Sequence, residues 1–204
     1  LQHIRWPTEA GTPFEKLLYL HRPYDLRRID EITEALALDE LCAYYVVMKR
    51  RTLKRRKQQA IALPQKTGLG RQLRDNLAFD LTRAQSRVIR ETLEDLKNDV
   101  PMLRLVQGDV GSGKTIVAAF AAIRAIEHGC QTAVMAPTEL LAEQHQLNFQ
   151  QWLDPLGIRV ALLTGQMTAK AQREVLADIE SGEVQVVIGT HALFQDDVEF
   201  TRLG

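Results

Sequence analysis

The stretch Gly108-Asp109-Val110-Gly111-Ser112-Gly113-Lys114-Thr115 restricts what this chain can fold into more than any other. It matches G-x-x-x-x-G-K-[ST], and it lies between an apolar run that reads as a strand (102–106) and a predicted helix (114–128), the context that a phosphate-binding loop needs. Gly111 and Gly113 let the backbone curl so that successive N–H groups face a polyphosphate. Lys114 is expected to reach the β- and γ-phosphates, and the Thr115 hydroxyl to ligate Mg²⁺. The sequence therefore predicts a nucleotide site.

Downstream of this loop, short apolar runs alternate with helical patterns. A helix begins after Thr82, where Gln85 completes a capping box. The strands are predicted at 132–136, 160–163 and 184–188, and the helices at 138–152 and 168–180. This alternation predicts βαβ units, and hence an α/β fold with a parallel sheet and flanking helices.

The first third of the chain reads as helical. Thr12, Pro13 and Glu15 mark a helix start, and this helix is expected to stop near Pro23. A second helical stretch from about residue 25 to 62 fits one long helix, or two with a break near 37–39. Residues 63–70 have the composition of a linker.

A basic run, residues 49–57, lies in that second stretch and gives the N-terminal part an excess of cations. Such a run attracts phosphates, or it is the solvated face of a helix. The sequence alone leaves both interpretations open.

Small and hydroxyl-bearing residues follow three of the predicted strands. In a parallel sheet, ligands bind at the carboxyl ends of the strands. Each turn, taken alone, also suits an ordinary helix N-cap. Three of them at successive strand ends point to a surface that donates hydrogen bonds to phosphates without reading bases. The residues concerned are Pro137, Thr138, Thr164, Gly165, Thr190 and His191.

Composition excludes several classes of protein. The 204 residues are 45% hydrophobic, with 12 Gly and 7 Pro, which excludes a disordered or collagen-like chain. No apolar run approaches the roughly 18 residues of a membrane span. Cys42 and Cys130 form no Cys-x-x-Cys pair, so neither a disulfide framework nor a zinc site is indicated. We expect a soluble, cytoplasmic protein.

Residues 77–204 resemble the first motor domain of superfamily-two helicases, and most closely the RecG type. The resemblance is carried by the blocks 105–115 and 136–145 and by Gly189-Thr190-His191-Ala192. Residues 1–76, with Leu20-His21-Arg22-Pro23, resemble more loosely the segment that joins the DNA-wedge domain to the motor in that type. The resemblance implies a RecA-like sheet, incomplete here, preceded by an all-helical segment. It also implies a parent enzyme that uses ATP to act on branched DNA, such as stalled forks and Holliday junctions, in recombination and repair.

The resemblance assigns roles to individual residues. Lys114 and Thr115 are the catalytic pair that holds ATP and Mg²⁺, within a loop formed by Gly108, Asp109, Val110, Gly111, Ser112 and Gly113. Gln85 corresponds to the adenine side, although its place in a capping box gives it a structural explanation too. The six strand-end residues correspond to positions that grip the DNA backbone.

One departure from the family pattern affects turnover. These motors need an Asp-Glu pair at the end of a further apolar strand to hold Mg²⁺ and position the attacking water. Here Asp196-Asp197 follow a polar Gln195 instead. The second motor domain with its arginine finger is absent as well. We expect a fragment of a longer protein that binds ATP without hydrolysing it.

The sequence leaves three alternatives open. The motor could belong to a transcription–repair coupling factor or a primosomal helicase. A P-loop phosphotransferase belongs to a different class. Its strand ends would offer substrate-binding Arg or Asp residues, whereas the strand ends here carry Pro-Thr and Thr-His turns, which argues against that class. The third is an interaction module that kept a nucleotide-binding fold without catalysis.

Overall fold

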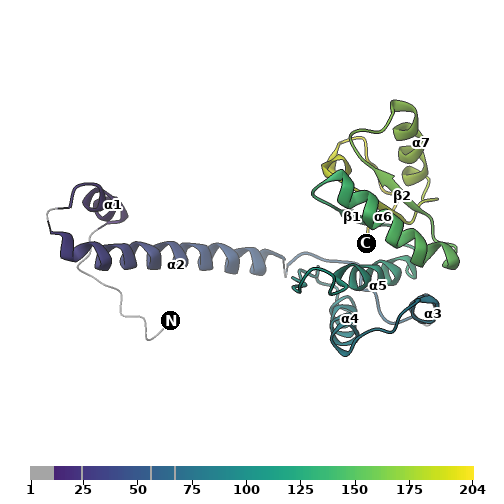
Figure 1. Cartoon of the computed structure of the whole chain (residues 1–204), viewed down its shortest axis with the longest axis horizontal. Coiled ribbons are helices and arrows are strands. Elements are labelled where there is room, and N and C mark those ends of the chain that lie inside the picture. The colour runs from purple at the N-terminus through teal and green to yellow at the C-terminus, as the bar shows by residue number, and fades with distance from the viewer. Residues whose placement is uncertain (1–11, 24, 56, 67) are drawn as a thin grey trace. The chain divides into compact units, whose positions relative to one another are not determined.

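The structure, a computed structural model, describes residues 12–23, 25–55, 57–66 and 68–204 (Figure 1). Its contacts divide the chain into two compact units, residues 1–58 and residues 59–204. The predicted boundary between segments 1–76 and 77–204 follows the family resemblance, not these contacts, and stays a prediction.

The first unit contains α1 (Pro13–His21), the short 3-10 helix η1 (Leu26–Arg28) and α2 (Ile29–Arg55). The predicted capping box at the start of α1 is present: Thr12 N donates to Glu15 Oε2 at 2.6 Å, and Glu15 N donates to the Thr12 hydroxyl. The hydrogen bonds that Thr12 donates to the Glu15 carboxylate, from its backbone N and from its hydroxyl, hold the pKa of Glu15 below its ordinary value. The buried Lys16 reaches from α1 to Asp39 on α2 at 2.7 Å.

Helix α2 is a single helix of 27 residues, so the alternative with a break near 37–39 is wrong. It also ends earlier than the predicted residue 62. The reason lies in the next segment, whose backbone pairs elsewhere: Ala60 N donates to Asp99 O, and Leu63 N donates to Leu96 O, both at 2.8 Å. Backbone groups committed to those partners cannot continue the helix.

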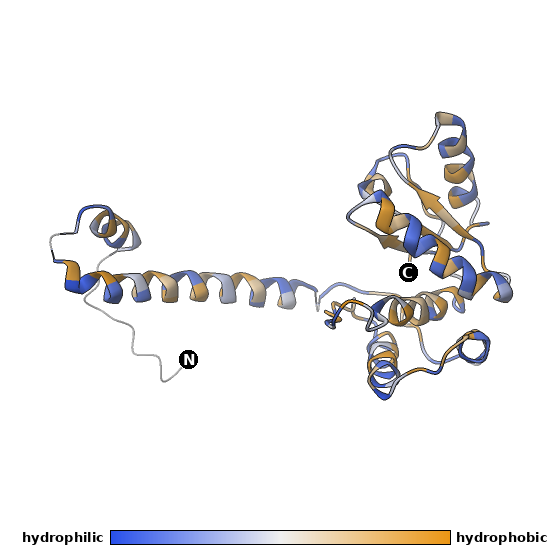
Figure 2. Ribbon diagram, in the orientation of Figure 1, coloured by the Kyte–Doolittle hydropathy of each residue, from blue (hydrophilic) through white to orange (hydrophobic). Residues whose placement is uncertain are grey.

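The second unit is built on a parallel sheet of three strands in the order β1-β3-β2. These are β1 (Thr132–Met135), β2 (Val160–Leu163) and β3 (Val186–Gly189). Their sequences are short and apolar, and Figure 2 accordingly shows these strands in the hydrophobic colour. The sheet and its flanking helices confirm the predicted α/β fold.

The helices α6 (Glu139–Leu153) and α7 (Ala169–Glu180) cover opposite faces of this sheet. Phe149 and Leu153 of α6 pack in one cluster with Val186 and Ile188 of β3. On the other face, Ile179 of α7 packs with Ala161 and Leu163 of β2 and with Val187 of β3. Val187 stands between Val186 and Ile188 in β3, so its side chain points to the opposite face of the sheet. Both helices begin where they were predicted to begin.

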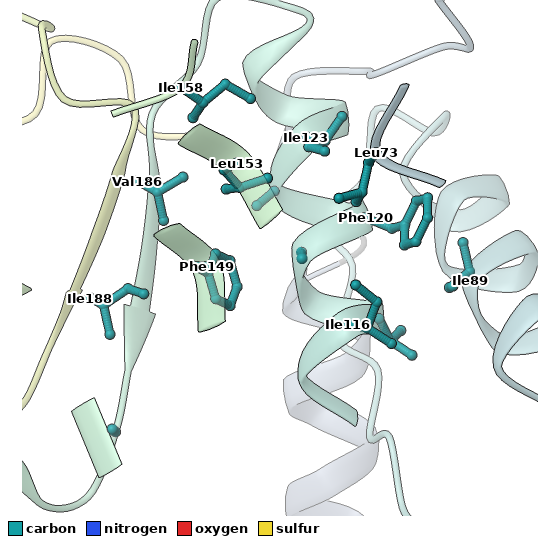
Figure 3. Close-up of a cluster of buried hydrophobic side chains, with 14 of the residues drawn as sticks. Leu73, Ile89, Ile116, Phe120, Ile123, Phe149, Leu153, Ile158, Val186 and Ile188 are labelled. Carbon is teal, nitrogen blue, oxygen red and sulfur yellow. The ribbon is translucent and has the colours of Figure 1, made fainter. Parts of the chain in front are cut away.

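The larger core continues from the sheet into a helical layer (Figure 3). This layer consists of α3 (Leu69–Asn76), α4 (Arg83–Asp95) and α5 (Lys114–Ile126). Leu73, Ile89 and Phe120 come from these three helices and are all buried. The almost wholly apolar α5 lies against α3, α4 and the sheet, so it is covered on several sides.

The predicted strand at 102–106 is wrong. These residues form no ladder with any part of the chain that the structure describes, and Leu103 and Leu105 are 76% and 85% exposed. A strand exists only through hydrogen bonds to a neighbour, and the three strands of the sheet pair with one another instead. Only Val106 packs against the core.

Helix α3 was not predicted, because Gly68 and Gly70 made its start read as a linker. The signal that could have found it is the spacing of Leu69, Leu73 and Leu77, which places three apolar side chains on one helical face. None of the helices in the described ranges is long and apolar enough to cross a membrane.

Candidate nucleotide and nucleic-acid site

The predicted phosphate loop leads directly into the first turn of α5. Gly111 and Gly113 both have φ of +81°, in the left-handed region that favours glycine. No side chain in the described ranges caps the N-terminus of α5, so its first N–H groups are left for another acceptor. Those donors and the positive end of the helix dipole together favour an anion at this point.

Lys114 folds back over the loop that it follows. Its Nζ donates to the carbonyl oxygens of Gly108 and Asp109, both at 2.7 Å. The ammonium group is exposed and makes no ion pair within the described residues. Its charge is therefore available to a phosphate held by the loop.

Thr115, the next residue, is half-buried at the start of α5. Its hydroxyl makes no hydrogen bond to another described residue, so its oxygen can serve as one ligand of a metal ion. The described part of the chain holds no cluster of three or more His, Cys, Asp or Glu side chains placed for a metal. That donor set fits Mg²⁺, which is usually held by few protein ligands together with phosphate oxygens and water.

Gln85 makes the capping contact considered for it, together with a contact that the sequence did not predict. Its Oε1 accepts from Thr82 N at 2.8 Å, which completes the predicted capping box of α4. Its Nε2 donates to the carbonyl oxygen of Ser112 at 2.9 Å, inside the phosphate loop. A Cβ on Gly113 would collide with this same Nε2. The first turn of α4 is thus fastened to the loop, and the adenine role of Gln85 stays a prediction.

The segment before the loop is fastened to the other end of α4. Arg104 lies 2.7 Å from Asp95 and 3.2 Å from Glu91. The hydrogen bond to Asp95 is the main reason that the pKa of Arg104 is raised above its ordinary value. Without a strand ladder, this ion pair and the packing of Val106 hold the segment that enters the loop.

The three predicted strand ends lie at one level along the same edge of the sheet. Gly189, the last residue of β3, is in register with Met135 on β1 and with Leu163 on β2. The residues that follow each strand are therefore neighbours along the carboxyl edge, although they are far apart in sequence. The structure brings together here the pairs Pro137-Thr138, Thr164-Gly165 and Thr190-His191.

Burial divides these residues into two groups. Pro137, Thr138, Gly165 and His191 are exposed. Thr164 and Thr190 are only 6% and 3% exposed, and the buried Thr190 hydroxyl has no hydrogen-bond partner among the described residues. The Thr138 hydroxyl also accepts from Leu141 N at 3.3 Å, as the N-cap of α6. The helix-cap explanation of this turn is therefore correct, and it leaves the hydroxyl at the surface.

The other charged residues considered in the sequence analysis are far from the phosphate loop along the chain. Asp196 and Asp197 follow the short helix η3 (His191–Phe194), and both are exposed. On α2, Lys49, Arg50, Arg51 and Lys54 are exposed and form no ion pair within the described part of the chain. The basic run is thus an exposed helical surface whose charge is not neutralised locally, and Arg56 lies outside the described residues.

Comparison with known proteins agrees with this geometry. The sequence model of one family, described as DEAD/DEAH box helicase, matches residues 82–203. ATP-dependent DNA helicase RecG of Pasteurella multocida is 45% identical over 196 residues, and that of Escherichia coli is 46% identical over the same length. Each match covers 93% of this chain and 28% of the relative.

A solved structure is also similar, that of RecG bound to a three-way DNA junction. It is 37% identical with a TM-score of 0.74, and the match covers 93% of this chain and 26% of that one. These comparisons confirm the resemblance to RecG helicases. Because 196 residues match, the similarity reaches beyond residues 77–204 into the helical segment before them. The chain spans a little over a quarter of the length of these relatives.

Proposed function

Because this chain belongs to the family of DEAD/DEAH box helicases, we propose that it is the ATP-binding part of a helicase motor that acts on branched DNA. The observation that carries the proposal is the phosphate loop at the uncapped start of α5, with Lys114 over the loop and the Thr115 hydroxyl free for a metal. The names of the similar proteins, ATP-dependent DNA helicases and one bound to a DNA junction, support ATP and branched DNA as the ligands.

The loop is proposed to hold the phosphates of ATP through its backbone N–H groups. Lys114 exchanges the two loop carbonyls for the β- and γ-phosphates, where a full charge makes the stronger hydrogen bond. Thr115 contributes one oxygen to Mg²⁺, whose other ligands come from phosphates and water. Gln85 stands on the adenine side and fixes the loop through Ser112.

The carboxyl edge of the sheet is proposed to contact the DNA backbone. Thr138 and His191 are exposed there and offer side-chain donors, while Gly165 allows a close approach of the backbone. Thr164 and Thr190 are buried, so their part is to shape the turns. Contacts of this kind grip DNA without regard to its sequence.

Hydrolysis is not expected of the 204 residues by themselves. Their sequence contains no Asp-Glu pair at the end of an apolar strand, and Asp196-Asp197 lie on an exposed turn. Phosphoryl transfer in such motors depends on charges that hold the metal and stabilise the transition state. We therefore propose binding of ATP without turnover.

Calorimetric titration with ATP and Mg²⁺ tests the nucleotide site. Lys114→Ala should remove most of the binding, because it deletes the cation that faces the phosphates. Lys170→Ala is the matched control, since Lys170 is an exposed lysine of α7 whose ion pair with Glu174 is long, at 3.9 Å. Equal loss in both variants, or no binding by the unmodified chain, would overturn the assignment.

A further inference from the structure

A second basic site lies in the residue 59–204 unit, between α3, α4, α5 and the segment before α3. It is a cavity of about 230 Å³. Phe120 and Ile123, labelled in Figure 3, form part of its apolar side. Its polar side carries four cations and one carboxylate, namely Lys66, Arg71, Arg74, Arg124 and Glu127.

The carboxylate in this cavity is already fully engaged. Glu127 Oε1 accepts from Leu69 N at 3.0 Å, and its Oε2 lies 3.4 Å from Arg124 Nε. Arg124 is only 7% exposed and also donates to the carbonyl oxygen of Leu63. Glu127 and Arg124 thus neutralise each other as a buried pair that shapes the wall.

The other three cations have no such compensation. Lys66 Nζ donates to the carbonyl oxygen of Glu127 at 2.9 Å, a contact that positions the ammonium group but leaves its charge. Arg71 and Arg74 are exposed and take part in no ion pair within the described residues. Because they stand at i and i+3 on α3, their side chains share one face of the helix.

This cavity is separate from the phosphate loop. It lies beside the C-terminal half of α5, whereas the loop precedes the first turn of that helix. Ten residues separate Lys114 from Arg124, which amounts to about 15 Å along a helix axis. The nucleotide held by the loop therefore does not supply an anion for this cavity.

We propose that this basic cavity binds a phosphate group of the DNA backbone, with Arg71 and Arg74 as its principal ligands. The inference rests on the proposed function of the chain as part of a DNA motor. Each guanidinium offers a planar fork of donors that fits phosphate oxygens. Exposed cations hold a single small anion weakly, but a polyanion that passes the mouth of the cavity gains by releasing its counterions.

The test compares two double variants of the whole 204-residue chain, each of which removes two positive charges. Arg71→Gln/Arg74→Gln changes the cavity. Arg90→Gln/Arg173→Gln is the matched control, because these arginines are exposed on α4 and α7 and line no part of the cavity. Binding of a fluorescent forked DNA is measured by anisotropy across a range of salt concentrations.

We expect the cavity variant to lower DNA affinity at least tenfold near 50 mM salt, and to reduce the slope of log K against log salt by about 0.9, the value for one lost phosphate contact. The control should change both quantities by much less. A third variant, Arg71→Lys/Arg74→Lys, keeps the charge but loses the forks, so it should weaken binding with little change in slope. Equal effects of cavity and control variants, in proteins with the same melting temperature, would overturn the proposal.

A second arm separates the DNA backbone from free phosphate. Titration with inorganic phosphate alone should give no measurable binding at millimolar concentration. The DNA assignment is wrong, and the cavity is a free-anion site, if three results occur together. Phosphate binds the unmodified chain tightly, the cavity variant loses that binding, and the DNA affinity of the cavity variant is unchanged. If the unmodified chain binds neither ATP nor DNA, the proposed function fails as well. If the unmodified chain binds ATP and DNA, and the cavity variant binds both with the same affinities, only this inference is overturned.

Discussion

The side-chain amide of Gln85 donates to the carbonyl oxygen of Ser112 at 2.9 Å, and so joins the first turn of α4 to the phosphate loop. The same side chain accepts from Thr82 N in the capping box of its own helix. One glutamine therefore stabilises a helix start and restrains the loop that precedes α5. The two functions use different atoms, so they can be separated by substitution.

Gln85→Glu should weaken ATP binding severalfold while it leaves the stability of α4 almost unchanged. Glutamate keeps the acceptor for Thr82 N but cannot donate to the Ser112 carbonyl oxygen. Thr82→Ala is the complementary variant: it removes the cap, should cost about 1 kcal/mol in the free energy of unfolding, and should leave ATP affinity nearly intact. Urea unfolding and calorimetry measure the two quantities. Equal ATP affinity in Gln85→Glu and the unmodified chain would show that the loop does not need this restraint.

Gly113→Ala should both destabilise the second unit and abolish ATP binding. Its φ of +81° strains any side chain by about 1–2 kcal/mol, and the added Cβ would collide with Gln85 Nε2. Gly129→Ala is the matched control, because Gly129 has φ of +71° but open space around its Cβ position. The control should lose stability from backbone strain and keep its ATP affinity. A loss of ATP affinity in Gly129→Ala equal to that in Gly113→Ala would trace the effect to general destabilisation.

These contacts mark the limit of what the sequence could predict. Local signals were sufficient where a cap defines an element: Thr12, Thr82 and Thr138 each sit at the start predicted for a helix. The strand at 102–106 failed because strand formation depends on a partner that local sequence does not reveal. The link from Gln85 to Ser112 spans 27 residues and leaves no periodic trace.

The sequence also did not reveal which of the residues at the strand ends are exposed to solvent. Thr138 and Thr190 have the same side chain and both follow a strand, yet the first is exposed and the second is 3% exposed. Thr190 directly follows the central strand β3, and its N still donates to Leu163 O of β2 at 3.3 Å, whereas Thr138 lies three residues beyond the end of the edge strand β1. Sequence predicted which edge of the sheet gathers these residues, but not which of them face outward.

The basic run on α2 should contribute to DNA binding through charge alone. Arg50→Gln/Arg51→Gln removes two exposed cations that have no ion pair in the described part of the chain. The slope of log K against log salt should fall by about 1.8, with equal effects on DNAs of unrelated sequence. Arg90→Gln/Arg173→Gln again serves as the control of equal charge. An unchanged slope would return this run to a solvated helix face.

ATP hydrolysis by the 204 residues should stay at background, with or without forked DNA. Catalysis in these motors is mainly positioning and charge stabilisation, and an arginine finger alone is worth roughly 10³–10⁵ in rate. The sequence offers Thr115 for the metal but no Asp-Glu pair on an apolar strand. A longer chain that adds such a strand and a second motor domain should show DNA-stimulated hydrolysis, measured as phosphate release, and Lys114→Ala should abolish it. Lys114-dependent hydrolysis by the 204 residues themselves would contradict this expectation. Its loss in Asp196→Asn/Asp197→Asn would then identify the exposed pair after η3 as the metal's carboxylates.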